Sequence, residues 1–363
     1  MSRAGGQVRL RIRVMTAFNV DGAGGGKAQR KPLWQARPEE IAMRLPTFTD
    51  VLAARKRIAA HLRPTPLHRY APLDALIGAE VWVKHENYQP VGAFKVRGGV
   101  NLLSSLGDEE RRRGVITAST GNHGQSIAFA ARLFGVKAYI CVPHAANPGK
   151  IAAIRGMGAE IVEHGERFDD AARRAQQLAR EKGYRFIHSA NEPMLIAGVA
   201  TEALEMLEER PEIDTIFVPV GLGSGASGTC IAAKAVNREI RVIAVQAAAS
   251  PAVHDSWRSG KIEVRPNETF AEGLSTGEAA EMTLEIMSRH LDDFQLVSEE
   301  EILQGMVWWV ERCHTLAESA AGAVLAAAYR LRISLKDCKV GLICSGGNTS
   351  LAHLKEALSR YRG

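Results

Sequence analysis

From Thr49 to the end of this 363-residue chain, short apolar runs alternate with stretches of helical pattern. Six runs are bounded by glycine, proline or charged residues, namely residues 81–84, 115–118, 138–142, 216–220, 242–245 and 340–344. Runs that are apolar at every position are typical of strands buried on both faces, as in a parallel sheet. The alternation therefore predicts an α/β fold with open, doubly wound parallel sheets.

The turns after these strands are the places to look for a ligand site. Open parallel sheets bind ligands outside the carboxyl ends of their strands. Three turns carry unusual residues: 119–124 (the asparagine turn), 221–228 (the glycine turn) and 345–349. A helix is predicted over residues 168–182, with Gly183 as its C-cap.

Composition limits the partners of the chain. The 46 Lys and Arg residues exceed the 40 Asp and Glu residues by only six. The run Arg111-Arg112-Arg113 follows Asp108-Glu109-Glu110 and indicates a solvated helix face, so we expect no nucleic acid partner. No apolar stretch is long enough to span a bilayer, so no membrane partner is expected.

The five cysteines form no CxxC pair and no zinc-ligand spacing. Several lie inside apolar runs. We interpret them as buried, reduced thiols, which favours a cytoplasmic location.

The first 46 residues differ from the rest, because they are rich in glycine and arginine and contain no acidic residue before Asp21. Three interpretations stay open: a disordered tail, an organelle transit peptide, or translated sequence upstream of a start at Met15 or Met43. We favour a tail or a misplaced start.

Lys95 lies between small residues and an aromatic residue, in Gly92-Ala93-Phe94-Lys95-Val96-Arg97-Gly98-Gly99. Burial would disfavour its ammonium form, lower its pKa and give the free amine that Schiff-base chemistry with an aldehyde requires. The alternative, a surface lysine in a glycine-rich loop, is equally compatible with this segment alone.

The glycine turn, which begins Gly221-Leu222-Gly223-Ser224-Gly225, follows a predicted strand and opens a helix. Backbone N–H groups and the positive end of that helix would converge on a phosphate. It lacks the Lys-Ser/Thr ending of a nucleotide-hydrolysing loop. The alternative is a turn that only packs a helix on a strand.

The asparagine turn, Ser119-Thr120-Gly121-Asn122-His123-Gly124, suits a carboxylate, since hydroxyl groups and first-turn N–H groups lie together there. We interpret His123 as a helix-start histidine rather than a base. A lysine amine, a phosphate site and a carboxylate site together fit pyridoxal phosphate holding an amino acid.

From about Phe48 onward the chain resembles the fold type II pyridoxal-phosphate enzymes, in the branch of threonine/serine dehydratases and serine racemases. The matching motifs, in order, are Arg63-Pro64-Thr65-Pro66-Leu67, Lys84-His85-Glu86-Asn87, Gly92-Ala93-Phe94-Lys95, the asparagine turn with Gln125, Pro219-Val220-Gly221, and Ser345-Gly346-Gly347-Asn348. The resemblance implies a tryptophan synthase β-like fold of two open parallel-sheet domains with the cofactor between them.

The resemblance also implies residue roles. Lys95 would carry the internal aldimine, Phe94 would pack on the pyridine ring, and Asn122 would bind the phenolic oxygen. The backbone of Gly221, Leu222, Gly223, Ser224 and Gly225 would hold the phosphate, and Ser345 would bind the ring nitrogen. Ser119, Thr120, Gly121, Asn122 and His123 would bind the substrate.

A neutral hydroxyl such as that of Ser345 does not keep the ring nitrogen protonated as an aspartate would, which favours expulsion of a β-substituent over transamination. We therefore expect the substrate amine to displace Lys95, which then takes the Cα proton. The β-hydroxyl leaves, and the product hydrolyses to a 2-oxo acid and ammonia. The expected activity is a threonine/serine-type dehydratase, an ammonia-lyase.

Departures from the family pattern qualify this expectation. Thr120 stands where racemases of this group carry a serine that acts as base on the opposite face. Residues 246–252 contain none of the carboxylates of the family's divalent-cation site, so we predict no metal there. The usual Gly-Gln-Gly-Thr is Gly198-Val199-Ala200-Thr201, which changes the packing. No room remains for a C-terminal regulatory domain, so isoleucine feedback is not expected.

The alternatives are a pyridoxal-phosphate-dependent racemase or β-replacement enzyme, and a dehydratase for a bulkier 3-hydroxy amino acid or a hydroxyectoine-derived substrate. A catalytically silent amino-acid-binding homologue is a further alternative. By resemblance, residues 47–113 and 191–363 form the large domain, residues 114–190 form a small mobile domain, and the chain is a homodimer or homotetramer.

Other features have structural interpretations. Trp308-Trp309 lies in a helical stretch and indicates core or a subunit contact. Glu311 and Glu318 flank His314 at helical spacing, which we interpret as pairing on a helix surface. Five further histidines show no ligand spacing: His61, His68, His188, His254 and His290.

Overall fold

The structure is a computed structural model that describes residues 44–144 and 146–361. The predicted tail, residues 1–46, therefore lies outside the described residues except for its last three. In the part that is described, no helix is long and apolar enough to cross a membrane.

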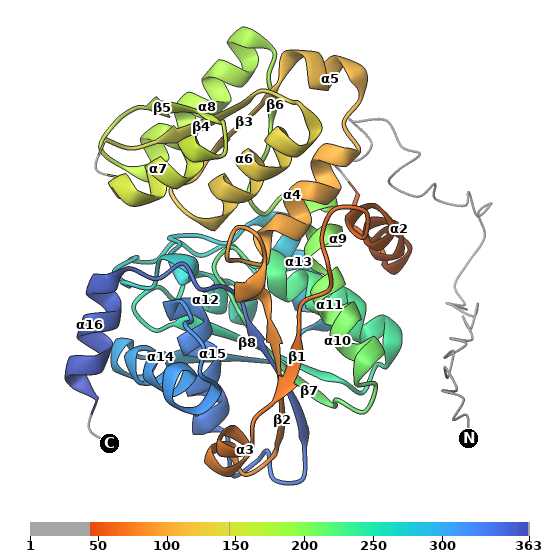
Figure 1. The fold of residues 1–363 in the computed structure, drawn as a ribbon, viewed down its shortest axis with the longest axis vertical. Helices are drawn as coiled ribbons and strands as arrows, with labels where there is room; N and C mark the ends of the chain where they lie inside the picture. The colour runs from red at the N-terminus through yellow and green to blue at the C-terminus, as the bar shows by residue number, and fades with distance from the viewer. Residues whose placement is uncertain (1–43, 145, 362–363) are drawn as a thin grey trace, which may run out of the picture. The chain divides into compact units, whose positions relative to one another are not determined.

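The larger sheet has six strands in the order β1-β2-β10-β7-β8-β9. All its neighbouring strands are parallel except β1 and β2, which are antiparallel. Its strands are β1 (Leu67–Arg69), β2 (Glu80–His85), β7 (Thr215–Pro219), β8 (Arg241–Ala247), β9 (Asp293–Val297) and β10 (Lys339–Cys344). Because β2, β7 and β10 are parallel neighbours, their carboxyl ends point to the same edge of the sheet (Figure 1).

Helices cover both faces of this sheet. In β7, Phe217 packs with α3 (Ala71–Ile77), α14 (Glu299–Cys313) and α15 (Ser319–Arg330) on one face. Its neighbours Ile216 and Val218 pack on the other face with α10 (Thr201–Glu209), α11 (Ser224–Val236) and α13 (Glu281–His290). Alternate residues of one strand thus enter two cores, which explains why the runs are apolar at every position.

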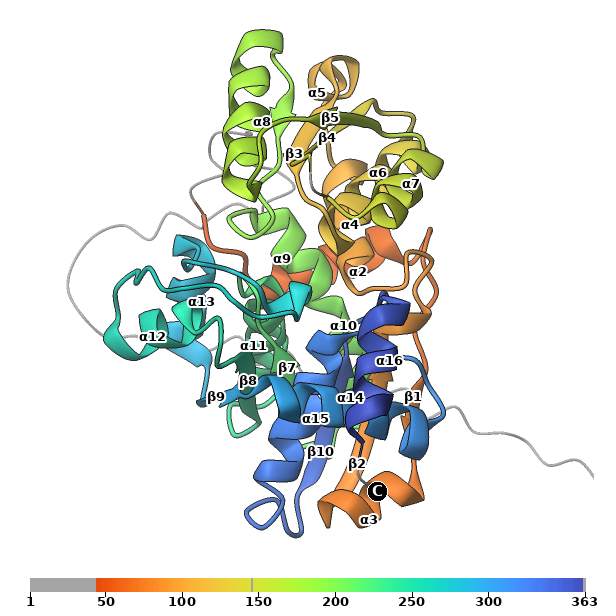
Figure 2. The ribbon, with the colours of Figure 1, turned by 90° about the vertical axis from the view of Figure 1, so that its left-hand side faces the viewer.

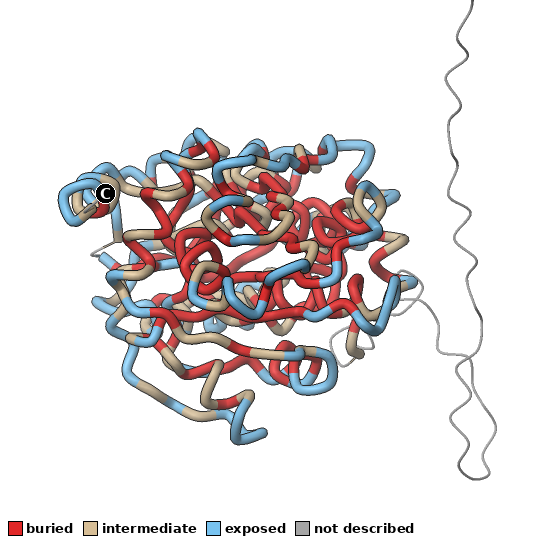
Figure 3. The backbone as a smooth tube through the Cα atoms, turned by 90° about the horizontal axis from the view of Figure 1, so that it is seen from below, coloured by how far each residue is buried: buried red, intermediate tan, exposed pale blue. Residues whose placement is uncertain are grey.

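The smaller sheet has four parallel strands in the order β5-β4-β3-β6. They are β3 (Val115–Ala118), β4 (Ala138–Val142), β5 (Glu160–Glu163) and β6 (Arg185–Phe186). One face packs on α8 (Phe168–Lys182), and the other on α6 (Asn122–Phe134) and α7 (Pro148–Gly156) (Figure 2). Buried residues are concentrated in the interior, and exposed residues lie mostly at the periphery (Figure 3).

Helix α4 (Lys95–Ser104) packs between α6 and α9 (Pro193–Val199). Two glycines permit this close approach. A side chain at Gly99 would place its Cβ 2.4 Å from Ser126 Oγ of α6, and one at Gly98 would lie 2.9 Å from the carbonyl oxygen of Leu195 in α9. Since α4 begins at Lys95, these contacts fix the backbone that carries the lysine. The core beside the smaller sheet also includes α4 residues such as Val100.

The remaining described elements are α2 (Phe48–Ile58), η2 (Glu86–Tyr88), α5 (Asp108–Arg113), α12 (Ala252–Ser259), η3 (Glu272–Leu274) and α16 (Leu351–Arg360). Helix α5 has no buried residue, as predicted for the charged run. Trp309 is buried in the core and donates to the carbonyl oxygen of Ala321 at 2.8 Å.

All six predicted strands are present, and the α/β fold is confirmed. The helix predicted over 168–182 is α8, and Gly183 ends it with a φ of 72°. The apolar-run criterion did not find the short or edge strands β1, β5, β6 and β9. β5, for example, begins and ends with exposed glutamates.

Candidate active site

Lys95 is the first residue of α4, at the edge where β10 ends. The preceding residue, Phe94, donates its backbone N–H to the carbonyl oxygen of Ser345 at 2.9 Å. The Nζ of Lys95 donates to Ser224 Oγ at 2.6 Å. Burial lowers the pKa of Lys95 to about 8, against the opposing effect of Glu202 and Glu318. Lys95 is thus a desolvated lysine rather than a fully solvated one, and its ammonium form is disfavoured.

The glycine turn lies between β7 and α11. Among the described residues, the backbone N–H groups of Leu222, Gly223, Ser224 and Gly225 have no protein acceptor. Close neighbours hold this turn: a Cβ at Gly221 would lie 2.5 Å from the carbonyl oxygen of Gly273, and Gly223 has a φ of 90°. A set of unpaired N–H groups at a helix N-terminus fits a phosphate group.

Phe94 lies against this turn. A Cβ at Gly225 would lie 3.2 Å from the Phe94 ring, and the Lys95 Nζ is 5.2 Å from the ring centroid. The aromatic ring, the lysine amine and the turn are therefore adjacent.

The asparagine turn lies between β3 and α6. Ser119 Oγ accepts from the N–H groups of Gly121 at 3.2 Å and Gly124 at 3.0 Å. In the described part of the chain no protein acceptor pairs with the N–H groups of Thr120, Asn122 or His123. The Ser119 oxygen thus holds the loop in shape while three N–H groups remain available for an anion.

Glu318 brings two of the predicted residues together. Asn122 Nδ2 donates to Glu318 Oε2 at 2.9 Å, and Ser345 Oγ donates to Glu318 Oε1 at 3.0 Å. Asn348 Nδ2 in turn donates to Asn122 Oδ1 at 2.8 Å. Burial raises the pKa of Glu318, while the two donated hydrogen bonds oppose the rise.

The interpretation of Glu318 as a helix-surface residue is wrong. It is buried before the first turn of α15, after His314 has already ended α14 with a φ of 51°. The sequence carried a signal that could have corrected this: Glu318 immediately precedes the small, apolar run from Ser319 to Ala328, where a surface carboxylate is out of place.

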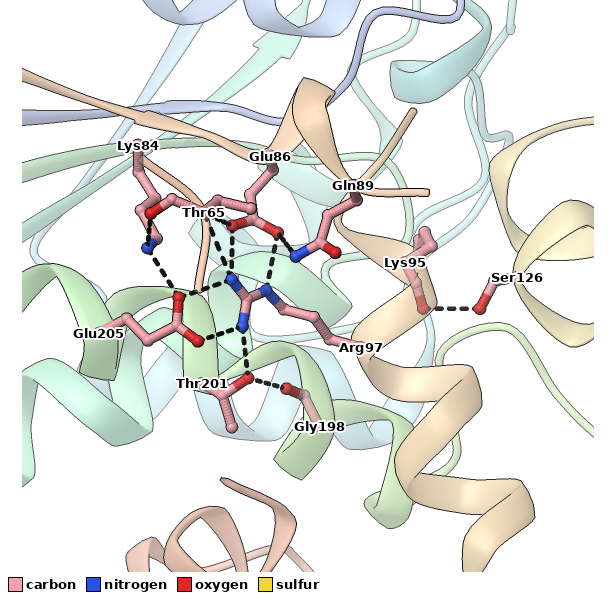
Figure 4. Close-up of polar contacts among 10 residues, drawn as sticks. All are labelled: Thr65, Lys84, Glu86, Gln89, Lys95, Arg97, Ser126, Gly198, Thr201 and Glu205. Carbon is pink, nitrogen blue, oxygen red and sulfur yellow. Dashed lines mark hydrogen bonds and ion pairs between the residues drawn. The ribbon is translucent and has the colours of Figure 1, made fainter. Parts of the chain in front are cut away.

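A buried cluster of charges lies beside Lys95 (Figure 4). Arg97, two residues along α4, donates to both carboxyl oxygens of Glu86 and of Glu205 at 2.7–2.8 Å. Lys84 Nζ also reaches Glu205, at 2.7 Å. Burial opposes the ionisation of Glu86, but the Arg97 guanidinium holds its pKa below the ordinary value. The charges of two cations and two carboxylates therefore cancel. Their hydrogen bonds fix the orientation of α4.

His123 is part of the asparagine turn, and its side chain contacts β3. Its Nε2 is 3.0 Å from Thr117 Oγ1, which itself donates to the carbonyl oxygen of Ile187. Burial and then the Lys95 charge hold the pKa of His123 well below its ordinary value. Because the Thr117 proton is directed to Ile187, the neutral imidazole of His123 donates from Nε2; that His123 is not the base stays a prediction.

No group of three or more His, Cys, Asp or Glu residues suited to a metal occurs among residues 44–144 and 146–361. At the end of β8, where a carboxylate would be expected for the cation site, Gln246 Oε1 accepts from the backbone N–H of His254 at 3.0 Å. Metal independence stays a prediction.

The site thus combines a desolvated lysine, two sets of unpaired N–H groups and two side chains that share one carboxylate. This donor set fits pyridoxal phosphate. Residues 58–346 match the family model described as "Pyridoxal-phosphate dependent enzyme", and the chain belongs to this family. The predicted family, fold and cofactor are confirmed.

The names of similar proteins indicate the class of reaction more closely than the family does. The chain is 35% identical over 315 residues to the L-threonine ammonia-lyase of Thermotoga maritima, covering 86% of this chain and 78% of that one. It is 37% identical over 318 residues to the L-threo-3-hydroxyaspartate ammonia-lyase of Saccharomyces cerevisiae, covering 87% and 98%. The structure of maize serine racemase superposes with a TM-score of 0.82 at 32% identity, covering 87% and 98%. The expected carbon–nitrogen lyase class is confirmed.

Proposed function

We propose that this protein is an ammonia-lyase that converts a 3-hydroxy amino acid of the threonine or serine type into a 2-oxo acid and ammonia. The observation that carries the proposal is the Lys95 amine, whose pKa is lowered to about 8 and which lies against the glycine turn. Near neutral pH an appreciable fraction of such an amine is unprotonated, as a nucleophile and a base both require.

Each part of the site has a proposed role. Lys95 would hold the cofactor through its amine and then take the Cα proton of the substrate. The N–H groups of residues 221–225 would bind the cofactor phosphate, and those of Thr120, Asn122 and His123 would bind the substrate carboxylate, with Ser119 and Gly121 shaping that turn. When bound, pyridoxal phosphate supplies the electron sink.

Ser345, Asn122 and Phe94 would contact the cofactor ring, as the resemblance implies. Because Ser345 Oγ and Asn122 Nδ2 both donate to Glu318, the carboxylate of Glu318 would orient both groups. The proton of Ser345 points to Glu318 here, and it would turn to the unprotonated ring nitrogen when the cofactor is bound. We add Glu318 to the proposed site for this reason.

Racemisation is the second candidate, because the maize serine racemase structure is similar over most of the chain. Thr120 argues against it, since a β-branched hydroxyl stands at the position proposed for the second base. Chiral analysis of the substrate recovered after partial turnover distinguishes the two reactions. A D-enantiomer that forms faster than the 2-oxo acid would favour the racemase.

The test is a panel of 3-hydroxy amino acids that includes L-threonine, L-serine and L-threo-3-hydroxyaspartate, with 2-oxo acid and ammonia measured together. We expect equal amounts of the two products from at least one substrate. The matched control is Lys95→Ala, which should form neither. A wild-type protein that binds pyridoxal phosphate but produces no 2-oxo acid from any of them contradicts the proposal.

We further propose a homodimer or homotetramer in a reducing, cytoplasmic compartment, with the domains at residues 47–113 plus 191–363 and residues 114–190. All five cysteines are free thiols, and four of them are buried, which supports the reducing compartment. Light scattering coupled to size exclusion measures the oligomeric state, and a monomer would contradict that part.

A further inference from the structure

His188 is a histidine whose sequence spacing indicated no ligand role, yet it lies beside the asparagine turn. It follows β6, the strand that pairs in parallel with β3. The backbone N–H of Ile187 donates to the carbonyl oxygen of Ile116 at 2.9 Å, and Thr117 Oγ1 donates to that of Ile187 at 2.8 Å. Since β3 runs directly into the asparagine turn, the carboxyl end of β6 places His188 next to the proposed carboxylate site.

The tautomer of His188 is determined by its own loop. Its Nδ1 accepts from the backbone N–H of Ala190 at 3.0 Å and from that of Asn191 at 2.9 Å. An Nδ1 that accepts two hydrogen bonds carries no proton, so the proton of the neutral ring is on Nε2. In the described part of the molecule no protein group accepts from this Nε2–H. The ring therefore presents one oriented and unused donor.

The ring also lies within electrostatic reach of the reacting lysine. Burial, and then the charge of Lys95, lowers the pKa of His188. His123, the other histidine here, already uses its Nε2 toward Thr117. His188 is thus the imidazole with a free donor near Lys95.

A 3-hydroxy amino acid has three polar groups. In the proposed function the amine lies at the Lys95 end, and the carboxylate binds the N–H groups of the asparagine turn. The oxygen on the β-carbon is left without a partner. We propose that His188 donates a hydrogen bond from Nε2 to this β-oxygen and so assists its departure. This inference rests on the proposed elimination.

The atom balance does not require His188 to lose its proton. The Cα proton passes to the amine of Lys95, the Cβ–O bond breaks with both electrons on oxygen, and the same proton returned by Lys95 lets the oxygen leave as water. A neutral imidazole N–H is too weak an acid to protonate it, but it stabilises the negative charge that develops there. His188 is a hydrogen-bond donor in this step.

Two substitutions distinguish the donor role of His188 Nε2 toward the substrate from the acceptor role of Nδ1 within its own loop. His188→Asn keeps an oxygen at the Nδ1 position for the N–H groups of Ala190 and Asn191 but has no atom at Nε2. His188→Gln keeps an N–H near Nε2 but removes the loop acceptor. The substrates are L-serine and 3-chloro-L-alanine, which share a carbon skeleton and both give pyruvate. Chloride leaves without a proton and depends far less on a hydrogen-bond donor.

We expect His188→Asn to lose about 10- to 100-fold in kcat/KM for L-serine and to stay within about threefold of wild type for 3-chloro-L-alanine. His188→Gln should retain the wild-type ratio of the two rates but melt at a temperature about 2 °C lower or more, because buried N–H groups lose their acceptor. Cofactor absorbance, measured on both variants, should match wild type.

Equal losses on the two substrates in His188→Asn, or none on either, overturn the inference while the proposed function stands. A wild-type enzyme that forms pyruvate from neither substrate contradicts the proposed function, and the inference about His188 is then contradicted as well. A His188→Gln variant that behaves like His188→Asn toward L-serine also contradicts the donor role.

Discussion

The glycine turn and the asparagine turn both join a parallel strand to a helix and both expose unpaired N–H groups, but they are held in different ways. A Cβ at Gly221 would meet the carbonyl oxygen of Gly273 at 2.5 Å, so backbone packing fixes the glycine turn. A Cβ at Gly121 would meet no heavy atom of the described residues within 4 Å. The asparagine turn is held instead by side-chain hydrogen bonds, which Ser119 accepts and which Asn122 and Asn348 donate.

The difference matches the two ligands proposed for these turns. A phosphate of a cofactor that stays bound needs a rigid site. A substrate carboxylate must enter and leave, so its site must be able to open. The asparagine turn is also linked to Glu318, which precedes α15, through the side chain of Asn122. The comparison therefore predicts that backbone changes damage the glycine turn and side-chain changes damage the asparagine turn.

Lys95 connects the two turns and should give the largest effect. Its Nζ donates to Ser224 at the glycine turn, and its carbonyl oxygen accepts from Ser126 Oγ on the helix that follows the asparagine turn. Lys95→Ala should lower kcat/KM by about 10⁴-fold or more, because both the nucleophile and the base are lost. Steady-state 2-oxo acid formation measures this. Lys95→Arg keeps the charge but should be equally inactive, and substantial activity in either variant would contradict the assignment.

Gly221→Ala and Gly121→Ala form a matched pair that tests the comparison directly. Gly221→Ala should lower the free energy of unfolding by about 1–3 kcal/mol and weaken cofactor binding, since backbone must move to admit the methyl group. Gly121→Ala should change stability by about 0.5 kcal/mol or less. Urea unfolding and cofactor titration of both variants provide the measurement. Equal effects at the two positions would show that the turns are held in the same way.

Much of this site could be predicted from the sequence, because local motifs determine local geometry. The glycine turn, the asparagine turn and Lys95 each lie in one short segment after a recognisable strand, and parallel strands bring such segments to one edge. Glu318 and His188 could not be found in this way. Glu318 contacts residues 196 and 27 positions away in the chain, and its own segment, although it indicates burial, does not reveal these partners. The tautomer of His188 depends on the hydrogen bonds that its loop donates to Nδ1, and the spacing of residues in the sequence does not predict these bonds.

Glu318→Gln should have an intermediate effect on the asparagine turn. A neutral amide cannot accept from both Asn122 and Ser345 as a carboxylate does, so kcat/KM should fall about tenfold. Burial raises the pKa of Glu318 above 4.5, so the folded chain holds this proton to higher pH than the unfolded chain does. The free energy of unfolding of wild type therefore contains a contribution that falls as pH rises from about 4.5 through the folded pKa.

The variant should lack that contribution. Relative to wild type, Glu318→Gln is expected to be more stable at pH 8 than at pH 4, as measured by urea unfolding at both values. A difference between the two proteins that stays constant across this range would contradict the assignment of a raised pKa to Glu318.

The smallest effect is expected from an ion pair that links helix α7, beside the smaller sheet, to η3. Lys150 Nζ contacts the carboxylate of Glu272, which is 50% exposed. Such a pair contributes about 1 kcal/mol or less and is screened by salt. Glu272→Gln should raise KM about two- to fivefold with kcat nearly unchanged, because the proposed closure of the small domain over the substrate would lose a contact while the reacting groups stay unchanged. Raising the salt concentration should remove the difference between wild type and variant. Lys150→Met combined with Glu272→Gln should be no worse than either single change, and additive losses would show that the pair does not hold the two sheets together.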